Sequence, residues 1–162
     1  MPIFMSYDGI PGDVTSKGHE NWIQLGTFEW GLGRGIANPG SSGADREADT
    51  PTVSEIIVTK ETDSATPPLI RASLGLPPSG EGKTVLIDFV KTDTAEPEPY
   101  IQITLTDTLV SNWSVSSGGD RPTERLALNF TAIEFKNIGM GPANDTGTPD
   151  PAAYDLSTEV GS

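Results

Sequence analysis

Residues 100–135 carry the pattern that most constrains how this chain can fold. Between positions 101 and 115 most odd positions are apolar, and most even positions hold Gln, Thr, Asn or Ser. Side chains alternate between the two faces of a strand, so a period of two predicts a long strand with one buried and one solvent-exposed face. A Gly-Gly-Asp turn at 118–120 leads into a second apolar series. The stretch therefore predicts a long hairpin whose exposed face has almost no charge and no catalytic group.

These strands are expected to bend. Fifteen residues at about 3.3 Å each would span roughly 50 Å, which is too long for one flat strand in a small domain. We therefore expect a strong bend or a break near residues 108–111. The second series changes phase near Thr131-Ala132, and an earlier apolar stretch, residues 22–32, changes face at Gly26-Thr27. Each phase change predicts a bulge or a bend, which is typical of strands in a small barrel or sandwich.

The rest of the chain predicts further short strands and one helix. Apolar runs indicate strands at residues 3–7, 53–60 and 84–90. Thr66 as a cap, Pro67 in the first turn and Gly75 at the end predict a helix over about residues 66–75. Residues 33–52 lack periodicity and predict a long extended loop, and residues 141–162 predict a loosely ordered tail or an edge strand. We expect one mainly β domain over residues 1–162, a small closed β-barrel or two-sheet sandwich.

Charge and cysteine content exclude several classes of protein. The chain has 162 residues, a formal net charge of −13 and no cysteine. An acidic chain lacks the clustered Lys and Arg that nucleic acids and anionic membranes need, and without thiols it has neither disulfides nor thiolate metal sites. No stretch approaches the ~20 apolar residues of a membrane span. The first residues do not resemble a secretory signal peptide, so any export is expected to use a route that reads no such signal. The acidity indicates solubility, or a surface that selects cargo or spaces subunits.

Catalytic and cofactor signals are weak throughout. His19, the one histidine, lies in a polar turn and is expected to be solvated; neither a catalytic triad nor a zinc site has the residues it needs. The Gly-rich segment at 31–35 lacks the spacing of a phosphate-binding loop. Most carboxylates lie in turns. The sequence therefore predicts no catalytic residue, no metal and no cofactor.

Two strand carboxylates need separate interpretation. Asp88 alternates with the apolar residues of its strand and is expected on the exposed face. Asp107 falls on the apolar face of the long strand, where it could pair with Arg121 or Arg125, or mark where the strand leaves the core.

Short motifs in a fixed order resemble those of the haemolysin-coregulated protein (Hcp) family, the tube subunit of type VI secretion systems. Each motif is weak alone, but their order and spacing along nearly the whole chain are specific. In this sequence they are Ile3-Phe4-Met5, Gly9-Ile10-Pro11-Gly12, Phe28-Glu29-Trp30-Gly31, Ala44-Asp45-Arg46, Val58-Thr59-Lys60, Asp63-Ser64-Ala65-Thr66-Pro67, Leu109-Val110-Ser111, Ser116-Ser117-Gly118-Gly119-Asp120-Arg121-Pro122-Thr123-Glu124 and Leu128-Asn129-Phe130.

The resemblance implies a structural, non-enzymatic role. Members of the family form a β-barrel with one helix, assemble into hexameric rings that stack into a tube inside a contractile sheath, and are expelled with effectors in the lumen. The implied partners are further copies of the chain and the sheath, spike and effector proteins. The loop would then contact the next subunit or ring through Arg34, Gly35, Ile36, Asn38, Asp45 and Arg46. The uncharged face with Thr104, Thr106 and Thr108 would line the lumen.

Two other interpretations remain open at this point. One is a tail-tube subunit of a phage or phage-like injection particle, built on the same kind of barrel. The other is a stand-alone acidic β-barrel that binds a small ligand. Ring formation separates the ligand-binding module from the two tube proteins.

Overall fold

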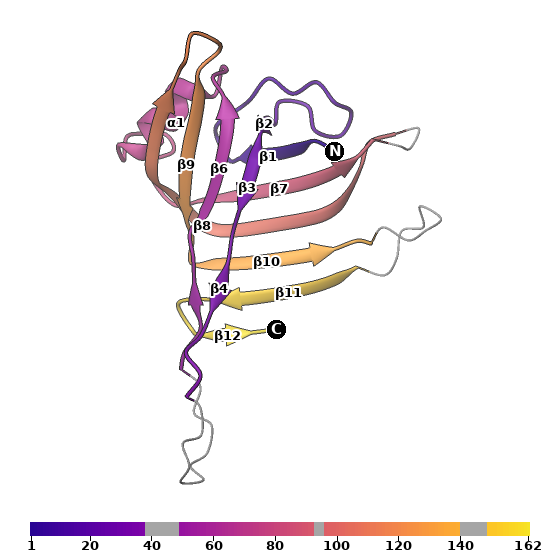
Figure 1. Ribbon diagram of the computed structural model, residues 1–162, viewed down its shortest axis with the longest axis vertical. Coiled ribbons are helices and arrows are strands. Elements are labelled where there is room, and N and C mark those ends of the chain that lie inside the picture. The colour runs from indigo at the N-terminus through magenta and orange to yellow at the C-terminus, as the bar shows by residue number, and fades with distance from the viewer. Residues whose placement is uncertain (38–48, 93–95, 140–148) are drawn as a thin grey trace.

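The chain folds into two antiparallel β-sheets and one short helix (Figure 1). A computed structural model describes residues 1–37, 49–92, 96–139 and 149–162. The elements are β1 (Ile3–Tyr7), β2 (Ile23–Leu25), β3 (Thr27–Glu29), β4 (Leu32–Gly33), β5 (Thr52–Val53), β6 (Ile56–Glu61), α1 (Thr66–Ser73), β7 (Lys83–Lys91), β8 (Glu98–Ser116), β9 (Thr123–Asn129), β10 (Ala132–Asn137), β11 (Asp150–Asp155) and β12 (Val160–Gly161). The mainly β architecture with one helix, predicted from the sequence, is confirmed.

One strand belongs to both sheets. The large sheet has the order β12-β11-β10-β8-β7-β1-β2, and the small sheet has the order β3-β6-β9-β8. The first half of β8 pairs with β7 and β10, and its second half pairs with β9. The two sheets therefore enclose one core, with β8 as the corner between them (Figure 1).

The corner in β8 lies where the sequence predicts a bend. Asp107 has a φ of 52°, a left-handed conformation that a non-glycine residue seldom adopts. Lys83↔Thr108 is the last pair with β7, pairing with β9 starts at Leu109, and a bulge follows at Ser111. Asp107 is exposed and forms no ion pair within the described ranges. It marks the exit of the strand from the large sheet, and the alternative pairing with an arginine is wrong.

Two other predicted bends are also passages between sheets. β2 ends and β3 begins at Gly26, whose N–H donates to the Thr59 carbonyl of β6 at 2.7 Å. Likewise, β9 of the small sheet ends at Asn129 and β10 of the large sheet starts at Ala132. A phase change in the apolar pattern therefore predicted each sheet switch.

Buried side chains from both sheets and from α1 form a single cluster. Leu69 and Ala72 attach the helix to it. The N-cap is Ala65, without a side-chain capping bond, so Thr66 is the first helical residue rather than the predicted cap. Gly75, with a φ of 73°, follows the helix as expected. The Thr66 hydroxyl has another role, described below.

β4, β5 and the residues beside them form an arm, defined here as residues 32–37 and 49–53. The strands pair through Leu32↔Val53 and Gly33↔Thr52, and the Asp49 N–H donates to the Gly35 carbonyl at 2.8 Å. Figure 1 shows the arm projecting beyond the sheets at one end of the long axis, opposite α1. The predicted loop over residues 33–52 thus begins and ends in a short ladder.

The C-terminal segment contributes the edge of the large sheet. β11 pairs with β10 along its length, and β12 pairs with β11. The edge-strand alternative for residues 141–162 is therefore the correct one for the described part of this tail, residues 149–162.

Candidate functional site

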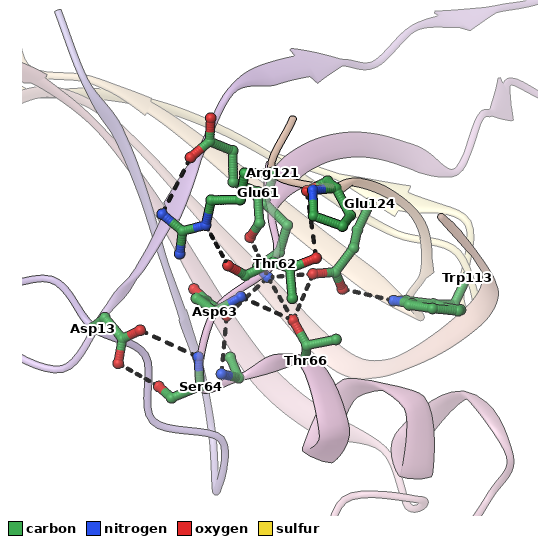
Figure 2. Close-up of polar contacts among 12 residues, drawn as sticks. Asp13, Glu61, Thr62, Asp63, Ser64, Thr66, Trp113, Arg121 and Glu124 are labelled. Carbon is green, nitrogen blue, oxygen red and sulfur yellow. Dashed lines mark hydrogen bonds and ion pairs between the residues drawn. The ribbon is translucent and has the colours of Figure 1, made fainter. Parts of the chain in front are cut away.

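A buried polar cluster joins β6, β9 and the start of α1 (Figure 2). Lys60 and Glu124 are directly opposite in the β6–β9 register, and both side chains are fully buried. The Lys60 Nζ lies 2.9 Å from Glu124 Oε2 and 2.8 Å from Asp63 Oδ1, and it donates to the Glu61 carbonyl at 2.9 Å. The ammonium group is therefore fully paired, which a buried charge requires.

Glu124 is held by three donors. Thr66 Oγ1 donates to Oε2 at 2.5 Å, and Trp113 Nε1 donates to Oε1 at 2.8 Å. Burial by itself raises the pKa of Glu124, but the bonds from Thr66, Trp113 and Lys60 outweigh it and bring that pKa below its usual range. The carboxylate thus stays ionised and fixes the helix start, through Thr66, to β9.

Two further contacts hold the connection between β6 and α1. Both the N–H and the hydroxyl of Ser64 donate to the Asp13 carboxylate, and these bonds lower the pKa of Asp13. From the β8–β9 turn, Arg121 donates to the Thr62 carbonyl at 2.8 Å and lies 3.3 Å from Glu61. The connection is therefore held from three sides, as Figure 2 shows.

The polar cluster borders a groove of about 330 Å³. Its walls come from the N-terminal loop (Asp13, Val14), from residues 24–26 at the end of β2, and from Glu61, Asp63 and Arg121. Asp13, Glu61, Asp63 and Glu124 stand against Lys60 and Arg121, a net formal charge of −2. This acidic groove is lined by side chains that bind one another, and it has no hydroxyl–histidine pair that would support nucleophilic catalysis.

His19 and Asp88 form a second buried pair, so the expectation that both are solvated is wrong. His19 Nε2 lies 2.8 Å from Asp88 Oδ2, with side chains 5% and 7% exposed. The His19 ring packs against Phe4 at 5.2 Å and Trp22 at 4.6 Å between centroids. Asp88 does point away from the main core, but the N-terminal loop folds over this face of the large sheet and covers it.

The sequence-predicted interface residues lie partly on the arm. Arg34, Gly35 and Ile36 are exposed there, and Ile36 retains half of its accessible surface. Arg34 forms no ion pair with a residue that the structure describes. A Cβ on Gly35 would meet Asp49 Oδ2 at 2.3 Å, which explains a glycine at this close crossing of the arm strands. Asn38, Asp45 and Arg46 lie outside the described residues.

The predicted lumen residues do not share one face. Thr106 is exposed and Thr104 is half-buried, but Thr108 is completely buried, and its backbone carbonyl accepts a bond from the Tyr7 hydroxyl at 3.3 Å. The left-handed turn at Asp107 inverts the alternation, so Leu109 becomes exposed instead. Thr108 therefore cannot line a lumen, whereas Thr104 and Thr106 remain candidates.

Sequence reasoning missed the polar cluster, although a signal was present. Lys60 has the parity of the buried Ile56 and Val58, and Glu124 has the parity of the buried Leu126. A charged residue in phase with buried neighbours on each of two strands indicates an internal ion pair. The partner strand had to be known before the two residues could be assigned to each other.

No group of three or more potential metal ligands occurs in residues 1–37, 49–92, 96–139 and 149–162. Within the same ranges, no helix has the length and apolar character needed to cross a membrane.

A two-sheet fold with one end helix, a projecting arm and ion pairs used internally defines a class of structural β proteins rather than an enzyme class. Residues 4–136 match the family model described as "Type VI secretion system effector, Hcp". The chain therefore belongs to the Hcp family of type VI secretion proteins.

Solved structures agree at the level of the fold. A type six secretion system protein superposes with a TM-score of 0.88 at 21% identity, covering 99% of both chains. Hcp1 from Salmonella typhimurium gives 0.78 at 22% identity over 99% of this chain and 98% of its own. A type VI secretion system effector from Yersinia pestis gives 0.70 at 22% identity, with 94% and 98% covered. No curated protein matches the chain.

Proposed function

We propose that this chain is a structural subunit of the type VI secretion tube, and that six copies form a ring which stacks with others. The family match over residues 4–136 carries this proposal. The exposed arm supports it, because a two-stranded ladder with apolar side chains in water is marginal unless something covers it. The role is structural rather than catalytic, with export by the secretion machinery and with sheath, spike and effector proteins as partners.

Electron microscopy of the purified protein tests this proposal directly. Rings with a wide central hole support a tube subunit, whether of a secretion system or of a phage-like particle. A protein that remains monomeric by light scattering at all concentrations overturns it and favours a ligand-binding module.

The acidity of the chain gives a second test of ring formation. Six copies would carry a formal charge of −78, six times −13. Like charges repel, and salt screens this repulsion over about 10 Å at 0.1 M. The ring population in sedimentation velocity should rise along a salt series, and a ring population that falls with added salt contradicts the electrostatic argument.

We propose further that the face bearing Thr104 and Thr106 lines the lumen. Uncharged hydroxyl side chains give a wall along which different proteins could pass. Thr104→Asp with Thr106→Asp should alter retention of a co-expressed effector, whereas Ser114→Asp, an exposed position on the other sheet, should not. Equal retention by both variants would assign the lumen to another face.

A further inference from the structure

We propose that the acidic groove receives the arm of another copy of this chain, with Arg34 of one copy facing Glu61 of the next. The inference rests on the proposed self-assembly and names where the arm binds. Both surfaces are exposed in the isolated chain, and each has what the other lacks.

The arm has uncovered apolar side chains and an unpaired cation. Leu32 is 65% exposed and Ile36 is 50% exposed, although both lie on a projecting ladder of two residue pairs. Between them lies Arg34, which has no carboxylate partner in the described ranges. A surface that combines apolar residues with an arginine is typical of the centre of a protein interface.

The acidic groove is complementary in charge and character. Its cluster has a net formal charge of −2, and Glu61 has a side chain 66% exposed, beside the groove mouth. Val14 and Leu25 supply apolar wall between the carboxylates. Glu61 is already 3.3 Å from Arg121, so a second guanidinium would complete a network of two cations and several carboxylates rather than a single surface pair.

The two surfaces lie at opposite ends of the molecule. Figure 1 shows the arm at one end of the long axis, while the end of β6 that carries Glu61 lies toward the other, near α1. The arm of a chain therefore cannot reach its own groove. A contact between two different surfaces is heterologous and repeats along its axis, so it extends an assembly instead of closing a dimer. Arm-to-groove contacts would thus connect successive layers of copies.

A charge swap tests the pairing. Arg34→Glu and Glu61→Lys should each weaken stacking by at least about fivefold per contact while leaving rings intact, because attraction becomes repulsion. The double variant should restore stacking, since the opposite charges face each other again. Arg125→Glu, exposed on the small sheet away from both surfaces, is the matched control. Stack length by electron microscopy and ring mass by light scattering give the two readouts.

The absence of native cysteine allows a second, independent test. Ile36→Cys and Gln24→Cys, made in separate proteins and mixed, should form a disulfide between copies under mild oxidation. Ile36→Cys mixed with Ser114→Cys is the control and should give only background coupling. The crosslink does not depend on intact rings, so it reports on the contact even if the quaternary structure differs.

The outcomes separate this inference from the proposed function. Rings that form and stack normally in both single charge variants, or equal coupling of Ile36→Cys with the groove and control cysteines, would overturn the arm-to-groove contact and leave the tube subunit standing. A wild-type protein without rings would overturn the tube subunit, and the crosslink would still decide the contact.

Discussion

The buried ion pair of Lys60 gives the sharpest stability prediction. Lys60→Met removes a fully buried ammonium group and leaves the carboxylates of Glu124 and Asp63 without their cation. Breaking a buried pair on one side costs about 3–5 kcal/mol. Glu124 keeps its bonds from Thr66 and Trp113, and Asp63 keeps the Ala65 N–H at 2.9 Å. We therefore expect a loss near the lower limit, about 3 kcal/mol.

A double variant separates charge from packing. In Lys60→Met with Glu124→Gln, the amide still accepts from Trp113 and can donate to Thr66 Oγ1, so no unpaired charge remains at this position. The double variant should be more stable than Lys60→Met alone by at least about 1 kcal/mol. Lys136→Met is the matched control, because its ion pair with Glu134 at 3.6 Å is exposed and should contribute below about 0.5 kcal/mol.

Urea unfolding followed by tryptophan fluorescence measures these differences, with sedimentation at the same concentration to confirm an equal oligomeric state. A loss of about 3 kcal/mol corresponds to roughly 6–12 °C in Tm for a chain of this size. The reasoning is refuted if Lys60→Met costs no more than the Lys136→Met control, or if the losses of Lys60→Met and Glu124→Gln simply add.

Three further predictions follow from the buried contacts. His19→Ala should lower the free energy of unfolding by about 2–3 kcal/mol, since it leaves Asp88 buried without a partner; an unchanged urea midpoint would contradict this. The pKa of Glu124 is below its usual range in the folded state, so its stabilisation is present above the unfolded value of about 4.3 and is lost as pH falls through the folded pKa. Acid unfolding monitored by fluorescence should therefore be less steep in Glu124→Gln, and identical acid curves would show that Glu124 plays no part. Gly12→Ala places a Cβ 2.3 Å from the Trp22 carbonyl oxygen and should cost about 1–3 kcal/mol by calorimetry; a wild-type Tm would mean that the loop yields freely.

Local sequence patterns determined the strands, the helix and the places where strands change sheet. The apolar phase is lost at Gly26, near Asp107 and at Thr131, and each of these positions is a passage between the two sheets. The reason is that a strand's alternation records which face is buried, and a strand that moves to another sheet must change its phase. The order of weak motifs also sufficed to indicate the Hcp family.

The candidate site could be predicted only in part. The arm residues Arg34, Gly35 and Ile36 are exposed as an interface residue must be, and the loop that carries them was recognisable from its missing periodicity. Thr108 was misplaced, because one residue in the left-handed conformation at Asp107 reverses the faces of everything after it. A pattern read along a strand cannot detect such a reversal when the residues on both sides are equally polar.

What only the tertiary structure decided is which polar residues are covered and by what. Asp88 faces away from the main core, as its parity predicts, and becomes buried because His19, 69 positions away, folds onto it. Lys60 and Glu124, 64 positions apart, become partners through the β6–β9 register. The sequence by itself determined the faces of strands and the family, because these depend on local alternation and motif order. Burial of charge depends on long-range pairing, and only the folded chain shows which segments meet.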